Sequence, residues 1–184
     1  MKLINTIEIN PFDYRNAEYE SPNVSLSEFP EQWNEFWRRC LSDKNLGNLC
    51  AIRKGSWLVD IETINDNELE EILRNELNKI GLEDFKDRVS IICGGIVVEE
   101  GDDLLIEPTC CGDIGNIVEW EGIFESESND WTQLWIGHPW LFYRKENGYV
   151  EFSDYTDLNL EDFKDIKSKF QFLEEALKKG AGKY

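Results

Sequence analysis

The chain has 184 residues, the size of one domain with one well-buried core. It carries 38 acidic and 19 basic side chains, and the formal net charge of −19 argues against direct binding to nucleic acid or to anionic membranes. Hydrophobic residues make up 41% of the chain and aromatic residues 12%, which excludes a disordered acidic polypeptide.

The first half of the chain alternates strands with helices. Residues 2–10 predict a strand, and aromatic and aliphatic side chains at three- and four-residue spacing between Phe29 and Leu41 predict a helix. Residues 49–52 and 57–61 predict two short strands around a turn at Lys54-Gly55. A second helix is expected to begin at Asn65 or Asp66 and to end at Gly81.

The second half is richer in strands. Residues 89–99 and 104–106 predict a largely buried hairpin with a bulge at Gly94-Gly95, and a short helix is expected around Trp120. Further strands are expected over residues 131–136, 140–144 and 149–152, the last two joined by a tight turn. Apolar residues from Leu160 to Leu177 have helical spacing and predict a closing helix.

Hairpin connections outnumber crossovers in this order of elements. We therefore predict an α+β fold with a largely antiparallel sheet and about four helices packed against it. No repeat or low-complexity linker marks an interior boundary, so residues 1–184 are expected to form a single domain.

The ends of the chain and its cysteines indicate a cellular location. Residues 1–12 lack the apolar run of a signal peptide, and no apolar stretch approaches the roughly 20 residues that cross a bilayer. The five cysteines are an odd number and two of them are adjacent, which is typical of reduced thiols. A cytoplasmic protein without disulfides is expected.

Charge is distributed unevenly along the chain. The 55 residues from Val89 to Tyr143 contain no Lys or Arg, but they contain eleven acidic residues. This stretch is either a solvated face that keeps the protein soluble or a docking surface for a basic partner, which neighbouring aromatic side chains would anchor. The predicted partner-binding residues are Glu119, Trp120, Glu121, Glu125, Glu127, Asp130 and Trp131.

A second candidate is a loop site formed by Cys110, Cys111, Asp113 and His138. A thiolate close to the only histidine of the chain could act as a nucleophile. Adjacent cysteines point to opposite sides of an extended chain, however, and a structural role is favoured for both thiols. We expect His138 to hydrogen-bond either the loop backbone or Asp113.

Metal and cofactor sites are not expected. The two cysteines and the histidine supply three ligands without Cys-x2-Cys spacing, and the acidic residues around Asp102 do not follow the pattern of a calcium-binding loop. No catalytic residue is assigned.

Several short motifs carry a resemblance over residues 90–155. They are Gly94-Gly95, Glu107-Pro108, Cys110-Cys111-Gly112-Asp113, Asn116, Trp120 and the segment 134–140, LWIGHPW. In these motifs the chain resembles a group of uncharacterised bacterial proteins with a Pro-x-Cys-Cys-x-Asp loop and a Trp-Ile-Gly-His-Pro segment. In size, acidity and α+β pattern it also resembles the SUKH superfamily and other immunity proteins of bacterial toxin systems, although no SUKH-type N-terminal motif is found in residues 1–60.

The second resemblance implies a cytoplasmic protein that binds a toxin and covers its active site. We therefore predict a non-enzymatic, immunity-type module that binds a basic protein, such as a toxin nuclease domain, without contacting nucleic acid or membranes itself. Two alternatives stay open: a small thiol-dependent enzyme that uses Cys110 or Cys111 with His138, and an acidic inhibitor that mimics DNA.

Overall fold

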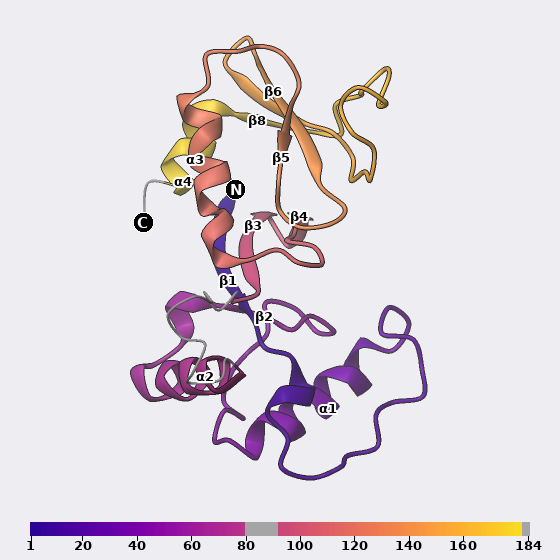
Figure 1. Cartoon of the computed structure of the whole chain (residues 1–184), viewed down its shortest axis with the longest axis vertical. Helices are drawn as coiled ribbons and strands as arrows, with labels where there is room; N and C mark the ends of the chain where they lie inside the picture. Colours follow the sequence, from indigo (N-terminus) through magenta and orange to yellow (C-terminus); the bar gives the residue numbers. More distant parts are fainter. Residues whose placement is uncertain (80–91, 182–184) are drawn as a thin grey trace. The chain divides into compact units, whose positions relative to one another are not determined.

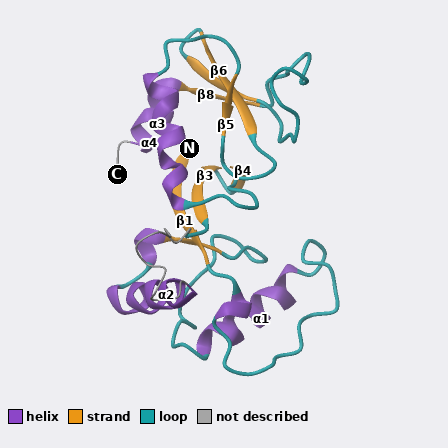
Figure 2. Ribbon diagram, viewed as in Figure 1, coloured by secondary structure: helices purple, strands orange, loops and turns teal. Residues whose placement is uncertain are grey.

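The computed structural model describes residues 1–79 and 92–181 (Figure 1). The fold is mixed α+β, as predicted, with four helices among the described residues and two four-stranded antiparallel sheets, in the strand orders β2-β1-β3-β4 and β5-β6-β7-β8 (Figure 2). The chain divides into two compact units, a helical unit of Thr6–Ile92 and a sheet unit of Met1–Asn5 with Cys93–Tyr184. Strand β1 contributes residues to both units, and no change of composition marks either boundary in the sequence.

The helical unit has a core of its own. Its elements are the end of β1 (Lys2–Glu8), the 3-10 turn η1 (Pro11–Asp13), α1 (Pro30–Ser42), β2 (Leu58–Asp60), the 3-10 turn η2 (Ile61–Thr63) and α2 (Asp66–Lys79). Helix α1 buries Phe36, Trp37, Cys40 and Leu41, the face that the sequence predicts. The indole N–H of Trp37 donates to the Ile9 carbonyl at 2.8 Å, which satisfies its one polar group within the core.

The predicted pair of strands in this unit is only partly formed. Strand β2 pairs antiparallel with β1 from Thr6 to Glu8, but the expected partner at residues 49–52 contributes a single bridge, from Ala51 to Val59. Helix α2 begins directly after Asn65, as predicted. Its predicted end at Gly81 and the first strand residues at 89–91 lie outside the described residues.

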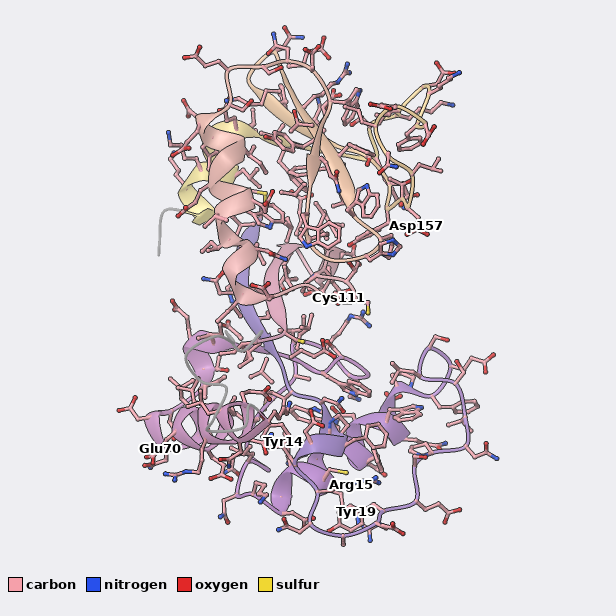
Figure 3. All side chains as sticks on the ribbon, in the orientation of Figure 1. Tyr14, Arg15, Tyr19, Glu70, Cys111 and Asp157 are labelled. Carbon is pink, nitrogen blue, oxygen red and sulfur yellow. The ribbon has the colours of Figure 1, made fainter. Side chains whose placement is uncertain are left out.

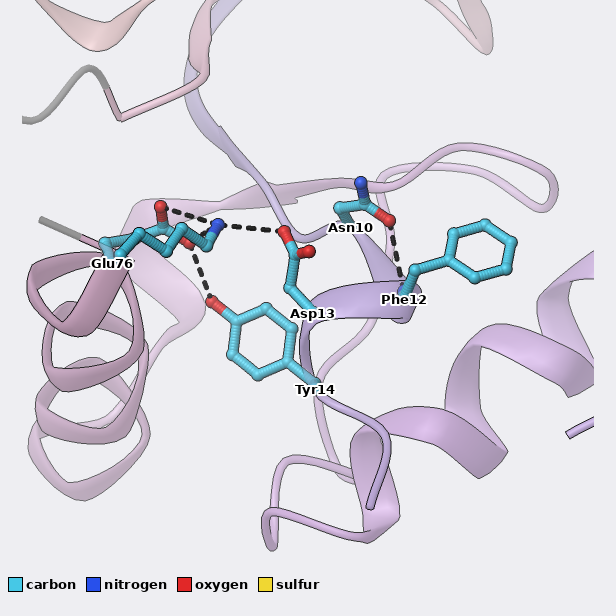
Figure 4. A network of polar contacts seen from close by, with 6 residues as sticks. Asn10, Phe12, Asp13, Tyr14 and Glu76 are labelled. Carbon is cyan, nitrogen blue, oxygen red and sulfur yellow. Dashed lines mark hydrogen bonds and ion pairs between the residues drawn. The ribbon is translucent and has the colours of Figure 1, made fainter. Parts of the chain in front are cut away.

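A polar network joins η1 to α2 within the helical unit (Figure 4). The ammonium of Lys79 lies 2.8 Å from Asp13 Oδ2 and 2.7 Å from Glu76 Oε1, and the buried Tyr14 hydroxyl donates to the same Glu76 oxygen at 3.4 Å. Burial, followed by the charge of Glu76, raises the pKa of Tyr14 well above its ordinary value. Tyr14 therefore stays protonated and acts as a donor.

The sheet unit contains the second sheet and its covering helices. Its elements are β3 (Gly94–Glu100), β4 (Asp103–Ile106), the 3-10 turn η3 (Ile114–Asn116), α3 (Ile117–Glu125), β5 (Thr132–Leu134), β6 (Leu141–Glu146), β7 (Tyr149–Phe152), β8 (Phe170–Leu173) and α4 (Glu174–Ala181). Trp120 and Ile123 of α3, Leu177 of α4 and the strand residues Phe152 and Phe172 belong to one buried cluster. The helices therefore cover this sheet with apolar side chains.

The predicted hairpins of the sheet unit are confirmed. Strands β6 and β7 pair from Tyr143 to Phe152 around a two-residue turn in which both Asn147 and Gly148 have positive φ, as in type I′ turns. Strands β3 and β4 also pair antiparallel, with an irregularity in register between Val98 and Glu99. This pairing covers Val98 to Glu100 of β3, so the bulge expected at Gly94-Gly95 stays a prediction.

The closing helix predicted from Leu160 to Leu177 is wrong over most of its length. Residues 170–173 form β8, which pairs with β7 through Phe152–Phe170 and Val150–Phe172, and the helix α4 begins only at Glu174. Strand β7 obtains a second hydrogen-bonded neighbour in this way, and the need to pair its backbone overrides the helical spacing. No helix within the described residues is long and apolar enough to cross a membrane.

Candidate functional site

The acidic segment, residues 117–130, consists of α3 and the loop that follows it in the sheet unit. On α3, the exposed residues Val118, Glu121 and Glu125 are three and four positions apart and share one face, whereas Trp120 and Ile123 point into the core. Trp120 is 1% exposed and packs against Phe152 with ring centroids 5.8 Å apart. The prediction that Trp120 anchors a partner is therefore wrong, because its side chain is part of the core.

The remaining predicted binding residues lie at or near the surface. Glu127 and Asp130 are exposed in the loop, and Glu119 is half-buried on α3. Trp131 is also half-buried, and the guanidinium of Arg144 lies 4.9 Å from the centre of its ring. Such a cation-π contact covers one face of the indole, so that a partner would meet Arg144 together with Trp131.

Sequence reasoning missed Val118, which is 60% exposed and is the most exposed large hydrophobic side chain among the described residues. A helical projection anchored on Trp120 places Val118 two positions away and so toward solvent, and this is the signal that could have found it. An exposed apolar side chain next to the carboxylate of Glu121 resembles the mixture of hydrophobic and polar side chains in a protein interface.

The basic residues nearest in sequence form their ion pairs outside the acidic segment, and the contact they make with its backbone is from the Lys145 ammonium, which donates to the Ser126 carbonyl at 2.8 Å. Arg144 pairs with Glu146 and Glu151 at 2.9 and 2.8 Å, and Lys145 pairs with Glu174 at 2.7 Å. Lys169 pairs with Asp154, whose pKa is lowered by that hydrogen bond. Within residues 1–79 and 92–181, no ion pair is formed by any of Glu119, Glu121, Glu125, Glu127 or Asp130.

The second candidate site is a tight turn that holds both adjacent cysteines. The Gly112 N–H donates to the Thr109 carbonyl at 2.9 Å, so Cys110 and Cys111 occupy the two central positions of a β-turn. Cys111 has a φ of 68°, in the left-handed region. Their sulfur atoms are 3.5 Å apart and both residues are exposed. The expectation that these side chains point to opposite sides is wrong, because the chain is not extended at Cys111 (Figure 3 labels this residue).

His138 lies directly across from this turn. It forms a bridge with Cys110, and its backbone N–H donates to the Cys110 carbonyl at 2.7 Å, one of the two arrangements expected for this residue. The imidazole Nδ1 is 3.2 Å from Asp157 Oδ1, and the ring meets Trp140 edge-on with centroids 5.0 Å apart. Figure 3 labels Asp157, which sequence reasoning missed because 19 positions separate it from His138.

The carboxylate of Asp113 bonds to the backbone of its own loop and not to His138, the partner that the sequence suggested. Its Oδ1 accepts the Gly115 N–H at 2.6 Å and so caps η3, and its backbone bridges to Cys93. The pairing of Asp113 with His138 is therefore wrong. Among the described residues, no group of three His, Cys, Asp or Glu side chains is arranged to hold a metal ion.

The residues that carry the sequence resemblance come together in the sheet unit. One packing gap, too small to hold a water molecule, is lined by Gly94, Gly95, Ile96, Pro108, Asn116, Trp120 and Ile136. The side-chain N–H groups of Asn116 and Trp120 are buried without a hydrogen-bond partner in the described part of the chain. These motif residues therefore pack together within the sheet unit.

Comparison of the chain with protein-family models, with curated proteins and with solved structures gave no match.

Proposed function

We propose that this protein is a non-enzymatic binding module of the immunity type, which uses the acidic segment to bind and neutralise a basic toxin domain. The observation that carries this proposal is the set of five carboxylates on α3 and its loop that form no ion pair within residues 1–79 and 92–181. Like charges on one short segment repel one another, and a basic partner would relieve this repulsion.

The acidic segment also combines charged side chains with an exposed apolar side chain, and protein interfaces use both. Carboxylates at its rim would steer a cationic surface toward it and raise the association rate. The partner would then cover Val118, which is exposed beside Glu121 at the start of the helix. A patch of this composition favours a partner whose own surface alternates Lys or Arg with a shallow apolar depression.

A nuclease domain fits this description well. Its substrate-binding surface is basic because it contacts phosphates, and carboxylates can occupy the positions of those phosphates. The acidic protein would then inhibit by covering the surface that the nucleic acid needs.

The proposal is tested by charge reversal on the acidic segment. Glu119, Glu121, Glu125 and Glu127 are replaced together by Lys, and a control variant carries Lys at Glu18, Glu20, Glu28 and Glu35, which are exposed in the helical unit. Each variant changes the formal net charge from −19 to −11, so only the location of the change differs. Circular dichroism of both variants checks that they are folded.

Wild-type protein and both variants are immobilised and exposed to cell lysate at low salt, and bound proteins are eluted by raising the ionic strength. We expect a basic protein that the wild type and the control retain and that the charge-reversed variant loses. With the purified partner, the association rate of the charge-reversed variant should fall about 10- to 100-fold at low salt. Equal retention by the two variants, or equal association rates, would contradict the proposed location.

A further inference from the structure

The turn of residues 109–112 arranges two thiols in a geometry that is unusual for adjacent residues. In an extended chain, successive side chains point to opposite faces. A positive φ at the third position of a β-turn reverses this relation, and Gly or Asn is the usual residue there. Here that residue is Cys111, with a φ of 68°, and its sulfur lies 3.5 Å from that of Cys110.

The turn is also held firmly from both sides within the sheet unit. Thr109 donates its N–H to the Ile136 carbonyl at 2.9 Å and its hydroxyl to the Pro139 carbonyl at 2.7 Å. His138 donates to the Cys110 carbonyl at 2.7 Å, and Gly94 donates to the Gly112 carbonyl at 3.2 Å. The backbone that carries the two thiols is therefore fixed before any ligand arrives, so binding through both costs only the entropy of their side-chain rotations.

We propose that Cys110 and Cys111 form a two-thiolate binding site for a thiophilic centre of pyramidal geometry, namely trivalent arsenic or its close chemical analogue antimony. With bonds of about 2.3 Å, the length of a zinc–thiolate bond, a sulfur separation of 3.5 Å corresponds to an angle of about 100° at the bound atom. A linear two-coordinate ion would need a separation of about 4.6 Å with the same bonds. The spacing therefore suits a pyramidal centre, whose third ligand comes from outside the protein.

Phenylarsine oxide is the probe, because its reaction with two thiols requires no oxidant. Two As–S bonds form, the bond from arsenic to the oxide oxygen breaks, and that oxygen leaves as water with the two thiol protons. Arsenic stays trivalent throughout. Because the second thiol is held beside the first, its effective concentration at the bound arsenic is high. We expect the pair to retain the arsenical about 100-fold or more strongly than a single thiol does.

The experiment treats the full-length, reduced protein with one equivalent of phenylarsine oxide and measures intact mass. We expect one adduct per chain that survives an excess of a monothiol and is removed by a small dithiol. The same adduct should protect both cysteines of the turn, and not Cys50, from alkylation by iodoacetamide. These two readouts on the wild-type chain do not depend on the folding of any variant.

Cys110→Ser and Cys111→Ser should each lose monothiol-resistant binding, whereas Cys50→Ser, which removes an exposed cysteine of the helical unit, should keep it. Adducts that a monothiol removes from the wild type, or adducts that persist in both turn variants, would overturn the proposal. The outcome is independent of the acidic segment, because the charge-reversed variant retains both cysteines and should bind the arsenical like the wild type.

Discussion

Asn65 and Glu68 cap each other at the start of α2. Asn65 Oδ1 accepts the Glu68 N–H at 3.1 Å, and Glu68 Oε2 accepts the Asn65 N–H at 3.2 Å. This reciprocal capping box satisfies backbone donors that the helix itself leaves unpaired. Asn65→Ala should lower the free energy of unfolding by about 1 kcal/mol, measured by urea denaturation. Asn65→Asp keeps the acceptor and should restore most of that loss, and equal losses in the two variants would contradict the capping role.

Asp43 should make the stability of the protein sensitive to acid. Its carboxylate accepts the Asn16 N–H and the Tyr19 hydroxyl, both at 2.7 Å, and these hydrogen bonds lower its pKa below the ordinary value of 3.8. A lowered pKa in the folded state means that the carboxylate stabilises the fold above the unfolded pKa, and that this stabilisation disappears as the pH falls through the folded pKa.

The comparison is between wild type and Asp43→Asn in urea denaturation at several pH values. The wild type should be more stable by a constant amount above about pH 5, and the difference should shrink steadily as the pH falls below about 4. A difference that does not change with pH would show that the charge of Asp43 has no part in holding residues 16–19.

Replacing two glycines of the sheet unit by alanine should change the stability of the protein in opposite directions. A Cβ at Gly112 would lie 2.6 Å from the Ile136 carbonyl oxygen, whereas a Cβ at Gly122 of α3 would meet no atom within 4 Å. Gly112→Ala should therefore destabilise the protein by about 2 kcal/mol or more, because backbone must move. Gly122→Ala should stabilise it by about 0.5–1 kcal/mol, since glycine is a poor helix former. Thermal denaturation of both variants tests the pair, and losses of equal size would contradict the close approach at Gly112.

The strained backbone at Cys111 is open to a similar test. Cys111→Gly removes a Cβ from the left-handed region, which should offset the entropic cost of the added glycine. Cys110→Gly brings the same entropic cost without such relief, because Cys110 does not have a positive φ. Cys111→Gly should therefore be the more stable variant by about 1 kcal/mol in urea denaturation. If both substitutions cost the same, the turn does not strain Cys111.

Elements with strong local signals could be predicted from the sequence. The periodic apolar face of α1, the cap at Asn65 and the turn at Asn147-Gly148 each depend on residues close together in the chain. The closing segment could not be predicted in the same way. Phe163 and Phe170 have helical spacing, yet Phe170 and Phe172 also alternate as in a strand, and only the open edge of β7 decides between the two patterns.

The candidate sites were predictable in composition and not in geometry. The lack of basic residues from Val89 to Tyr143 is visible in the sequence, and once Trp120 is assigned to the core, helical spacing places Val118 at the surface. The assignment of Trp120 to the core itself depends on packing against residues far away in the sequence, such as Phe152. The proximity of the two sulfur atoms depends on a φ value at Cys111 that residue type alone does not favour.

The close packing at the cysteine turn has a consequence for evolution. A Cβ at Gly112 or at Gly137 would lie 2.6 Å from backbone oxygens, so selection for a stable fold would retain both glycines whether or not the thiols bind anything. Their retention in relatives would therefore carry no information about function. The informative signal is whether relatives lose Cys110 and Cys111 together. If both sulfur atoms are needed to chelate a ligand, the loss of one cysteine removes the selection that retains the other.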